Sequence, residues 1–209
     1  MNLLATSAPG ALDLAILAAL PLVAVPVEGA FEPLTQGRRL LLARDGLYIE
    51  AANAGLYVRR RIVGCSAPWG QVSEAVILRQ GAIPASVASE LGRAARGAYP
   101  NEMAALVLAT PDGGYAVHHP YADATGGSVS YADTGYDEDA LVIDAHSHGE
   151  HPAYFSRMDD DSDRSRIGPH LSVVFGRCAP GGSIEVNARV CVGDYLLPMN
   201  RSEFEELFA

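Results

Sequence analysis

Apolar positions in the second half of the chain recur first at the spacing of a helix and then at that of strands. Within residues 85–98 the apolar side chains that share one face are Val87, Leu91, Ala94, Ala95 and Ala98. A helix is therefore expected over 85–98, and Pro100 is expected to end it. Shorter apolar runs predict strands over 103–109, 115–119, 140–148, 171–176 and 183–192.

The first eighty residues have a different pattern. Within 38–63, strand-like runs are separated by the turn signals Asp45-Gly46 and Asn53-Ala54-Gly55, which predicts a β meander. Residues 72–78 alternate in the same way. The composition changes at Gly81, where Ala-rich helical patterning begins. We therefore expect a β-rich N-terminal region over residues 1–80, and over 81–209 an α/β (α+β) domain in which helices flank a mixed β-sheet.

The remaining segments give weaker signals. Residues 11–20 favour a short helix before Pro21, and residues 120–138 are polar enough to form a loop or an edge strand near any site. Residues 156–167 favour a second helix in the domain. Ser202-x-x-Glu205 has the form of a capping box, which predicts a short helix at the end of the chain.

Charge and cysteine content narrow the classes of function. A formal net charge of −10 argues against nucleic acid as a partner, because such a binder needs a basic face for phosphates. Three cysteines without a CxxC pair fit a reducing cytoplasm. The apolar segment 12–25 is interrupted by Asp13 and Pro21 and is too short to span a membrane. No Lys or Arg precedes Arg38, so a signal peptide is the less favoured interpretation and a cytoplasmic protein is expected.

Side chains that can bind metal or take part in catalysis are most concentrated within residues 144–163, directly after an apolar run. His146 and His148 are two apart on the expected strand, so both side chains point to the same face. Asp159, in the first turn of the expected helix, can face back toward the end of that strand. Two imidazoles and a carboxylate give the three protein ligands of a catalytic Zn²⁺ site, with a fourth position for water.

Two further residues suit the same chemistry. Glu102 lies at the start of an apolar strand, where a carboxylate is costly unless it is paired or functional. Beside a zinc-activated water it could act as the general base and later protonate a leaving amine. Ser156 could donate a hydrogen bond to the oxyanion that forms when a carbonyl is attacked.

Simpler interpretations of the same residues remain open. Ser156-x-x-Asp159 also has the form of a plain capping box. Neighbouring acidic residues suit a solvated helix face near its N-terminus; they are Asp160, Asp161 and Asp163. His118 and His119 are expected at a strand end. His151 and His170 are expected at the protein surface or in a supporting role beside the ligands.

The combined pattern resembles the JAB/MPN (JAMM) metalloprotease family. In that motif an upstream Glu precedes His-x-His-Pro, six further residues and Ser-x-x-Asp. Glu102, His146, His148, Ser156 and Asp159 occupy its positions in order and spacing, and Gly149 stands where the family usually has proline. The resemblance covers about residues 84–193. It implies a JAB1/MPN-like fold and a zinc-dependent hydrolase of peptide or isopeptide bonds after ubiquitin-like tails, with these residues as base, ligands and oxyanion stabiliser.

Two segments, 152–163 and 173–176, are similar to the bacterial JAB proteins of the PRTRC system. That resemblance implies a ubiquitin-like or sulfur-carrier-like protein as substrate and an E1-like activating enzyme as a possible partner. Two alternatives remain. One is a non-catalytic MPN-type scaffold, and the other is a zinc hydrolase of small amides.

Overall fold

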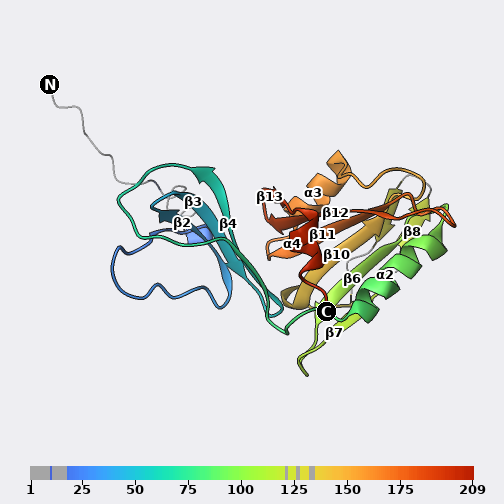
Figure 1. The fold of residues 1–209 in the computed structure, drawn as a ribbon, viewed down its shortest axis with the longest axis horizontal. Coiled ribbons are helices and arrows are strands. Elements are labelled where there is room, and N and C mark those ends of the chain that lie inside the picture. Colours follow the sequence, from blue (N-terminus) through green and yellow to red (C-terminus); the bar gives the residue numbers. More distant parts are fainter. Residues whose placement is uncertain (1–9, 11–17, 121, 126–127, 132–134) are drawn as a thin grey trace.

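The computed structural model describes residues 10, 18–120, 122–125, 128–131 and 135–209. The described chain forms two separate larger sheets, seen at the left and right of Figure 1, and a small hairpin. No helix in this part of the chain is long and apolar enough to cross a membrane. Most of the helix expected over 11–20 lies outside the described residues.

The first sheet is built from the N-terminal residues in the order β1-β2-β3-β4-β5. Its strands are β1 (Leu22–Ala24), β2 (Gly37–Ala43), β3 (Gly46–Ala52), β4 (Leu56–Gly64) and β5 (Ala75–Leu78). Strands β2 to β5 pair antiparallel, as expected of a meander, and β1 adds in parallel to β2.

The second sheet has six strands in the order β13-β12-β11-β10-β6-β7. They are β6 (Ala104–Ala109), β7 (Tyr115–His118), β10 (Leu141–Ser147), β11 (His170–Gly176), β12 (Glu185–Val192) and β13 (Tyr195–Pro198). Among the described residues, β10 and β11 form the one parallel pair of this sheet. A parallel pair needs a crossover connection, and here the crossover contains a helix.

The helices and the hairpin complete the domain. They are α2 (Ala85–Ala98), the 3₁₀ turn η1 (Glu138–Ala140), α3 (Arg157–Ser165), α4 (Arg201–Glu205), β8 (Ala122–Thr125) and β9 (Ser128–Tyr131). A mixed sheet with flanking helices behind a β-rich N-terminal region confirms the expected fold class. Strand β13 and the β8–β9 hairpin were not predicted as separate strands.

The cap of α4 corrects a sequence prediction. The helix is capped by Asn200, whose side chain accepts from the Glu203 backbone N–H, while the Glu203 carboxylate accepts from the Asn200 backbone N–H. The capping box is therefore Asn200-x-x-Glu203, not Ser202-x-x-Glu205. Both patterns are present in the sequence, and the helix begins at the earlier one because β13 ends only two residues before Asn200.

Opposite faces of the six-stranded sheet carry different helices. Helix α2 lies against an apolar face through Val87, Leu91 and Ala95, and the C-terminal α4 packs on the same side. The core there also includes buried side chains from three strands: Ile143, Ala145, Leu171, Val173 and Val190. Helix α3 lies on the other face of the sheet (Figure 1), where the strands present mainly polar side chains.

The two sheets are joined at the start of β10. Buried Asn53 donates to the carbonyl oxygens of Leu141 (2.8 Å) and Pro169 (3.0 Å). Core residues Ile49 and Leu56 of the first sheet belong to the same apolar cluster as the second sheet. These contacts lie at the end of β10 away from His146, so the join supports the strand without covering the histidines.

Candidate metal centre

Strand β10 places two histidine side chains against each other at its C-terminal end. His146 lies within the strand and His148 just after it, and their Nε2 atoms are 3.2 Å apart. Both side chains are largely buried. The edge of the Tyr154 ring packs against His148, with the ring centroids 4.7 Å apart. The alternation expected from the sequence thus brings the two imidazoles to one face.

Asp159 approaches the histidines from the first turn of α3. Its Oδ1 lies 3.1 Å from Nε2 of His146, and its Oδ2 lies 3.7 Å from Nε2 of His148. A tetrahedral Zn²⁺ site with bonds of about 2.0–2.1 Å has ligand-to-ligand edges of roughly 3.3 Å. The Nε2–Nε2 distance of 3.2 Å and the 3.1 Å from His146 to Oδ1 of Asp159 are close to that edge, and the N₂O set is one that zinc takes.

Ser156 and Asp159 form the capping box of α3. The Ser156 side chain accepts from the Asp159 backbone N–H at 3.2 Å, and Asp159 Oδ2 accepts from the Ser156 backbone N–H at 2.6 Å. The capping interpretation is therefore correct, and it leaves Oδ1 of Asp159 directed at His146. Because the Ser156 oxygen accepts in this bond, its hydroxyl proton can still be donated to a substrate.

Glu102 is buried next to this cluster, two residues before β6. The neighbouring Met103 fixes its position by exchanging hydrogen bonds with Ser147: the Met103 N–H donates to the Ser147 hydroxyl at 2.9 Å, and the Ser147 N–H donates to the Met103 carbonyl at 3.0 Å. Burial raises the pKa of Glu102, although the nearby His148 and His146 oppose the shift.

Gly149 allows the segment before Glu102 to come close. Its φ is +53°, and a Cβ at this position would lie 2.7 Å from the carbonyl oxygen of Pro100. Proline requires a φ near −65°, so the residue that the resembled family usually has cannot adopt this backbone. The departure from the motif has a local cause: the turn after His148 packs directly on residues 100–101.

Asp159 and His146 perturb each other's ionisation. Burial alone would raise the pKa of Asp159, but hydrogen bonds from His146 and His148 outweigh burial and hold that pKa well below its usual range. Burial alone would lower the pKa of His146, and Asp159 raises it overall. The donor set is thus a carboxylate held ionised beside two imidazoles, which suits a divalent cation.

Two residues for which the sequence suggested solvent exposure are buried: Asp163, assigned to a solvated helix face, and His170, left open between a surface group and a support for the ligands. Asp163 is 3% exposed and His170 is fully buried, so Asp163 does not belong to a solvated helix face and His170 is not a surface group. His151 is exposed, and His119 lies 3.5 Å from Glu90 at the surface. Asp163 shares a face of α3 with Asp159, four residues earlier, and that spacing was the signal available in the sequence.

Asp163, His170 and Cys191 form a second group of potential ligands, with donor atoms within 4.8 Å of one another. The guanidinium of Arg189 already contacts Oδ2 of Asp163, with Nε at 2.8 Å. Burial and the Asp163 carboxylate raise the pKa of the Cys191 thiol, which keeps it protonated. Because Arg189 and Cys191 both contact Oδ2 of Asp163, we describe this group as a buried ion-pair and hydrogen-bond cluster.

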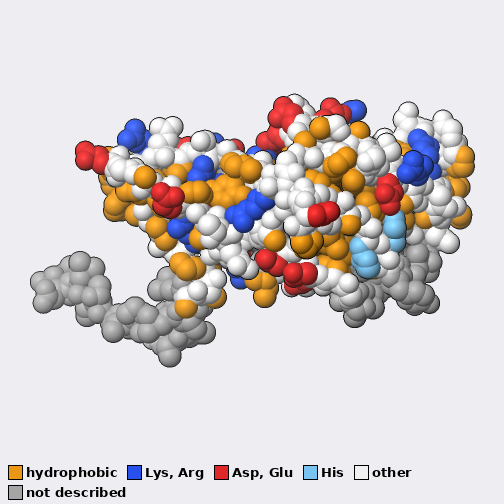
Figure 2. Space-filling model, turned by 90° about the horizontal axis from the view of Figure 1, so that it is seen from below, with side chains coloured by type: hydrophobic (Ala, Val, Ile, Leu, Met, Phe, Trp, Pro, Cys, Tyr) orange, Lys and Arg blue, Asp and Glu red, His pale blue; other side chains and the backbone are white. Residues whose placement is uncertain are grey.

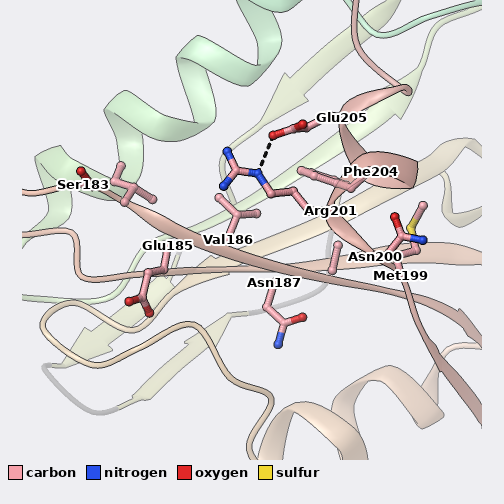
Figure 3. Close-up of a pocket in the computed structure, with 11 residues that line it drawn as sticks. Ser183, Glu185, Val186, Asn187, Met199, Asn200, Arg201, Phe204 and Glu205 are labelled. Atoms are coloured by element: carbon pink, nitrogen blue, oxygen red, sulfur yellow. Dashed lines mark hydrogen bonds and ion pairs between the residues drawn. The ribbon is translucent and has the colours of Figure 1, made fainter.

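A cavity of about 540 Å³ lies elsewhere, between β12 and α4 (Figure 3). Glu185 and Asn187 point to one side of β12 and Val186 to the other, toward Arg201. The 2.6 Å ion pair of Arg201 with Glu205 closes part of its rim. None of the residues that line the cavity belongs to the His146–Asp159 cluster.

Two segments of the chain are similar to known protein families. Residues 84–189, just over half of the 209, match the family described as prokaryotic homologs of the JAB domain. Residues 10–79 match a domain of unknown function, DUF2016. No curated protein matches the chain. The first match includes every residue of the candidate centre: Glu102, His146, His148, Ser156 and Asp159.

Proposed function

The chain belongs to the prokaryotic homologs of the JAB domain, and on that basis we propose that it is a zinc-dependent hydrolase of peptide or isopeptide bonds. The observation that carries the proposal is the convergence of the His146, His148 and Asp159 donor atoms beside the buried carboxyl group of Glu102. A scaffold that had lost catalysis would not need to keep a buried carboxylate next to such a set.

Each residue of the centre has a distinct role in the proposed reaction. His146, His148 and Asp159 would hold the metal, which would supply Lewis-acid activation of a water molecule. Glu102 accepts the proton of that water on a carboxylate oxygen and later gives it to the leaving amine. The hydroxyl of Ser156 donates a hydrogen bond to the carbonyl oxygen of the substrate as negative charge develops there.

The substrate class is a further part of the proposal. The similarity of 152–163 and 173–176 to PRTRC-system JAB proteins supports a ubiquitin-like or sulfur-carrier-like protein as substrate, in a cytoplasmic system that includes an E1-like activating enzyme. On the face shown in Figure 2, the described acidic and basic side chains are interspersed among apolar ones. This distribution and the net charge of −10 support a protein rather than a nucleic acid as partner.

The test compares the wild-type protein with Glu102→Gln. Both are expected to retain one zinc ion per chain, measured by elemental analysis after gel filtration. Hydrolysis of a ubiquitin-like protein fused through its C-terminal tail to a reporter is expected to fall by about 10²–10⁴-fold in the variant. Glu90→Gln, a carboxylate removed from the exposed side of α2, is the matched control and should keep full activity.

Three other outcomes would contradict the proposal or favour an alternative function. Full activity of Glu102→Gln would contradict the assigned base. A wild-type protein without stoichiometric zinc, and with unfolding unaffected by chelator, would favour the MPN-type scaffold. Cleavage of small amides but not of protein fusions would favour the small-amide hydrolase.

A further inference from the structure

Helix α3 carries a metal ligand yet has almost no apolar side chain in contact with the sheet. Its sequence is Arg157-Met158-Asp-Asp-Asp-Ser-Asp-Arg-Ser165, and Met158 is 65% exposed. Among the described residues of α3, Asp163 alone is buried. Helices are usually held to a sheet by an apolar stripe. This one is held by a buried carboxylate.

Asp163 contacts side chains from the two strands beneath it. Its Oδ1 lies 3.3 Å from Nε2 of His170 on β11. Its Oδ2 accepts from Nε of Arg189 at 2.8 Å and from the Cys191 thiol at 3.3 Å, both on β12. All three partners are buried, so these contacts are shielded from water and from salt.

Arg189 extends the attachment to the start of α3. Its NH1 donates to Oδ1 of Asp160 at 2.6 Å, and its guanidinium stacks 3.8 Å above the ring of Phe155. Phe155 directly precedes the capping residue Ser156. One side chain of β12 therefore contacts the chain before and after Asp159.

We propose that Asp163, held by Arg189 and His170, is a positioning residue that fixes Asp159 against the histidines and so sets the metal affinity of the site. The inference rests on the proposed zinc function. Asp159 and Asp163 are one helical turn apart on the same face, so a shift of Asp163 on the sheet moves Asp159 relative to β10. The capping box fixes Asp159 within α3, and the Asp163 contacts fix α3 on the sheet.

The test measures zinc affinity by competition with a chromophoric chelator, with no activity assay. Asp163→Asn keeps the size of the side chain and removes the charge that pairs with Arg189. We expect it to weaken zinc binding about 10–100-fold, as loss of a residue that orients ligands does elsewhere. Asp161→Asn makes the same chemical change on the exposed side of α3 and should change affinity less than about twofold.

A double-mutant cycle separates positioning from a general loss of structure. With Asp159→Asn already present, adding Asp163→Asn should change the residual zinc affinity less than about twofold, because Asp163 acts through Asp159. A merely structural role would weaken binding equally in both backgrounds and would overturn the proposal. The absorption spectrum of bound Co²⁺ should also change in Asp163→Asn and stay unchanged in Asp161→Asn.

The outcomes are distinguishable from failure of the proposed function. If the wild type and Asp161→Asn bind no zinc, the zinc function itself is wrong. If both bind zinc and Asp163→Asn binds it equally well, the positioning role is wrong. Should Asp163→Asn not fold, His170→Phe removes one contact and keeps the Arg189 pair. We expect about fivefold weaker binding, the equivalent of one lost hydrogen bond, and unchanged affinity would again overturn the proposal.

Discussion

The two faces of the six-stranded sheet are both buried, but they are built from opposite chemistry. Toward α2 the strands present aliphatic side chains such as Ile143, Leu171 and Val190. Toward α3 the neighbouring positions of the same strands are His170 and Arg189, with His146 at the end of β10. Because side chains alternate along a strand, one set of backbone hydrogen bonds supports both faces.

This difference indicates which face determines the stability of the domain and which determines the geometry of the candidate site. Apolar burial is not directional, so the α2 face contributes mainly to the free energy of folding. Hydrogen bonds and ion pairs require defined geometry, so the α3 face sets where ligand atoms lie.

Metal removal should lower the free energy of unfolding through the α3 face alone. If His146, His148 and Asp159 hold zinc in the folded state, free zinc at about 1,000 times its Kd should stabilise the protein by about 4 kcal/mol. Chemical unfolding with zinc and with excess chelator measures this difference. In Asp159→Asn the difference should nearly disappear. An equal zinc effect in that variant would contradict the assigned ligands.

Leu171→Ala should lower the free energy of unfolding through the α2 face alone. Leu171 is fully buried between β10 and β12, so removing its side chain is expected to lower the free energy of unfolding by about 3 kcal/mol. Zinc affinity of the folded protein should remain within about twofold of the wild type. A large loss of affinity in this variant would show that the two faces are not separable.

The lowered pKa of Asp163 should contribute measurably to the pH dependence of stability. Burial alone would raise the pKa of Asp163, but His170 and Arg189 outweigh burial and lower that pKa from 3.8 to about 2. A depressed pKa stabilises the folded state above pH 3.8, and this contribution is lost as the pH falls through 2. It amounts to about 2 kcal/mol.

The measurement compares urea unfolding of chelated wild type and Asp163→Asn between pH 5 and pH 2. The wild type should lose about 2 kcal/mol more than the variant over this range. Asp159 is present in both proteins, so its own titration cancels in the comparison. Parallel curves would mean that the pKa of Asp163 is the same in the folded and unfolded protein, which would contradict the assigned contacts with His170 and Arg189.

Ser156→Ala should have the smallest effect on stability. Loss of the cap is expected to cost about 1 kcal/mol, measured by thermal unfolding. If the hydroxyl also stabilises the oxyanion, kcat should fall by a larger factor than the change in stability explains. Ser156→Thr keeps both the cap and the hydroxyl, and it should restore both properties. Loss of stability without loss of kcat would leave Ser156 with the capping role alone.

The sequence predicted the α2 face more fully than the α3 face. Helix α2 begins and ends where its apolar spacing and Pro100 indicated, because burial of Val87 and Leu91 follows a period that is visible in the chain. Asp163 was assigned to solvent because acidic residues in a helix are rarely buried. Its burial depends on Arg189, which lies 26 residues later and becomes a neighbour only through the sheet order.

The candidate centre was predicted as a set of residue types and spacings, and the structure brings those residues together. The backbone conformation at Gly149 could not be predicted from the sequence. Its positive φ and its close approach to Pro100 are properties of the folded backbone. Glu102 is placed beside the histidines by that contact and by the Met103–Ser147 bonds, neither of which has a signature in the sequence.

The crossover between β10 and β11 has a consequence for the order of folding events. His146, His148 and Asp159 lie within fourteen consecutive residues of this single connection, whereas Glu102 is separated from them by more than forty. Contacts that are near in sequence close with a smaller entropic cost and form sooner. If the proposed zinc function is right, we therefore expect the three ligands to come together in a folding chain before Glu102 joins them. A partly folded molecule would then hold zinc without the base that the proposed hydrolysis needs.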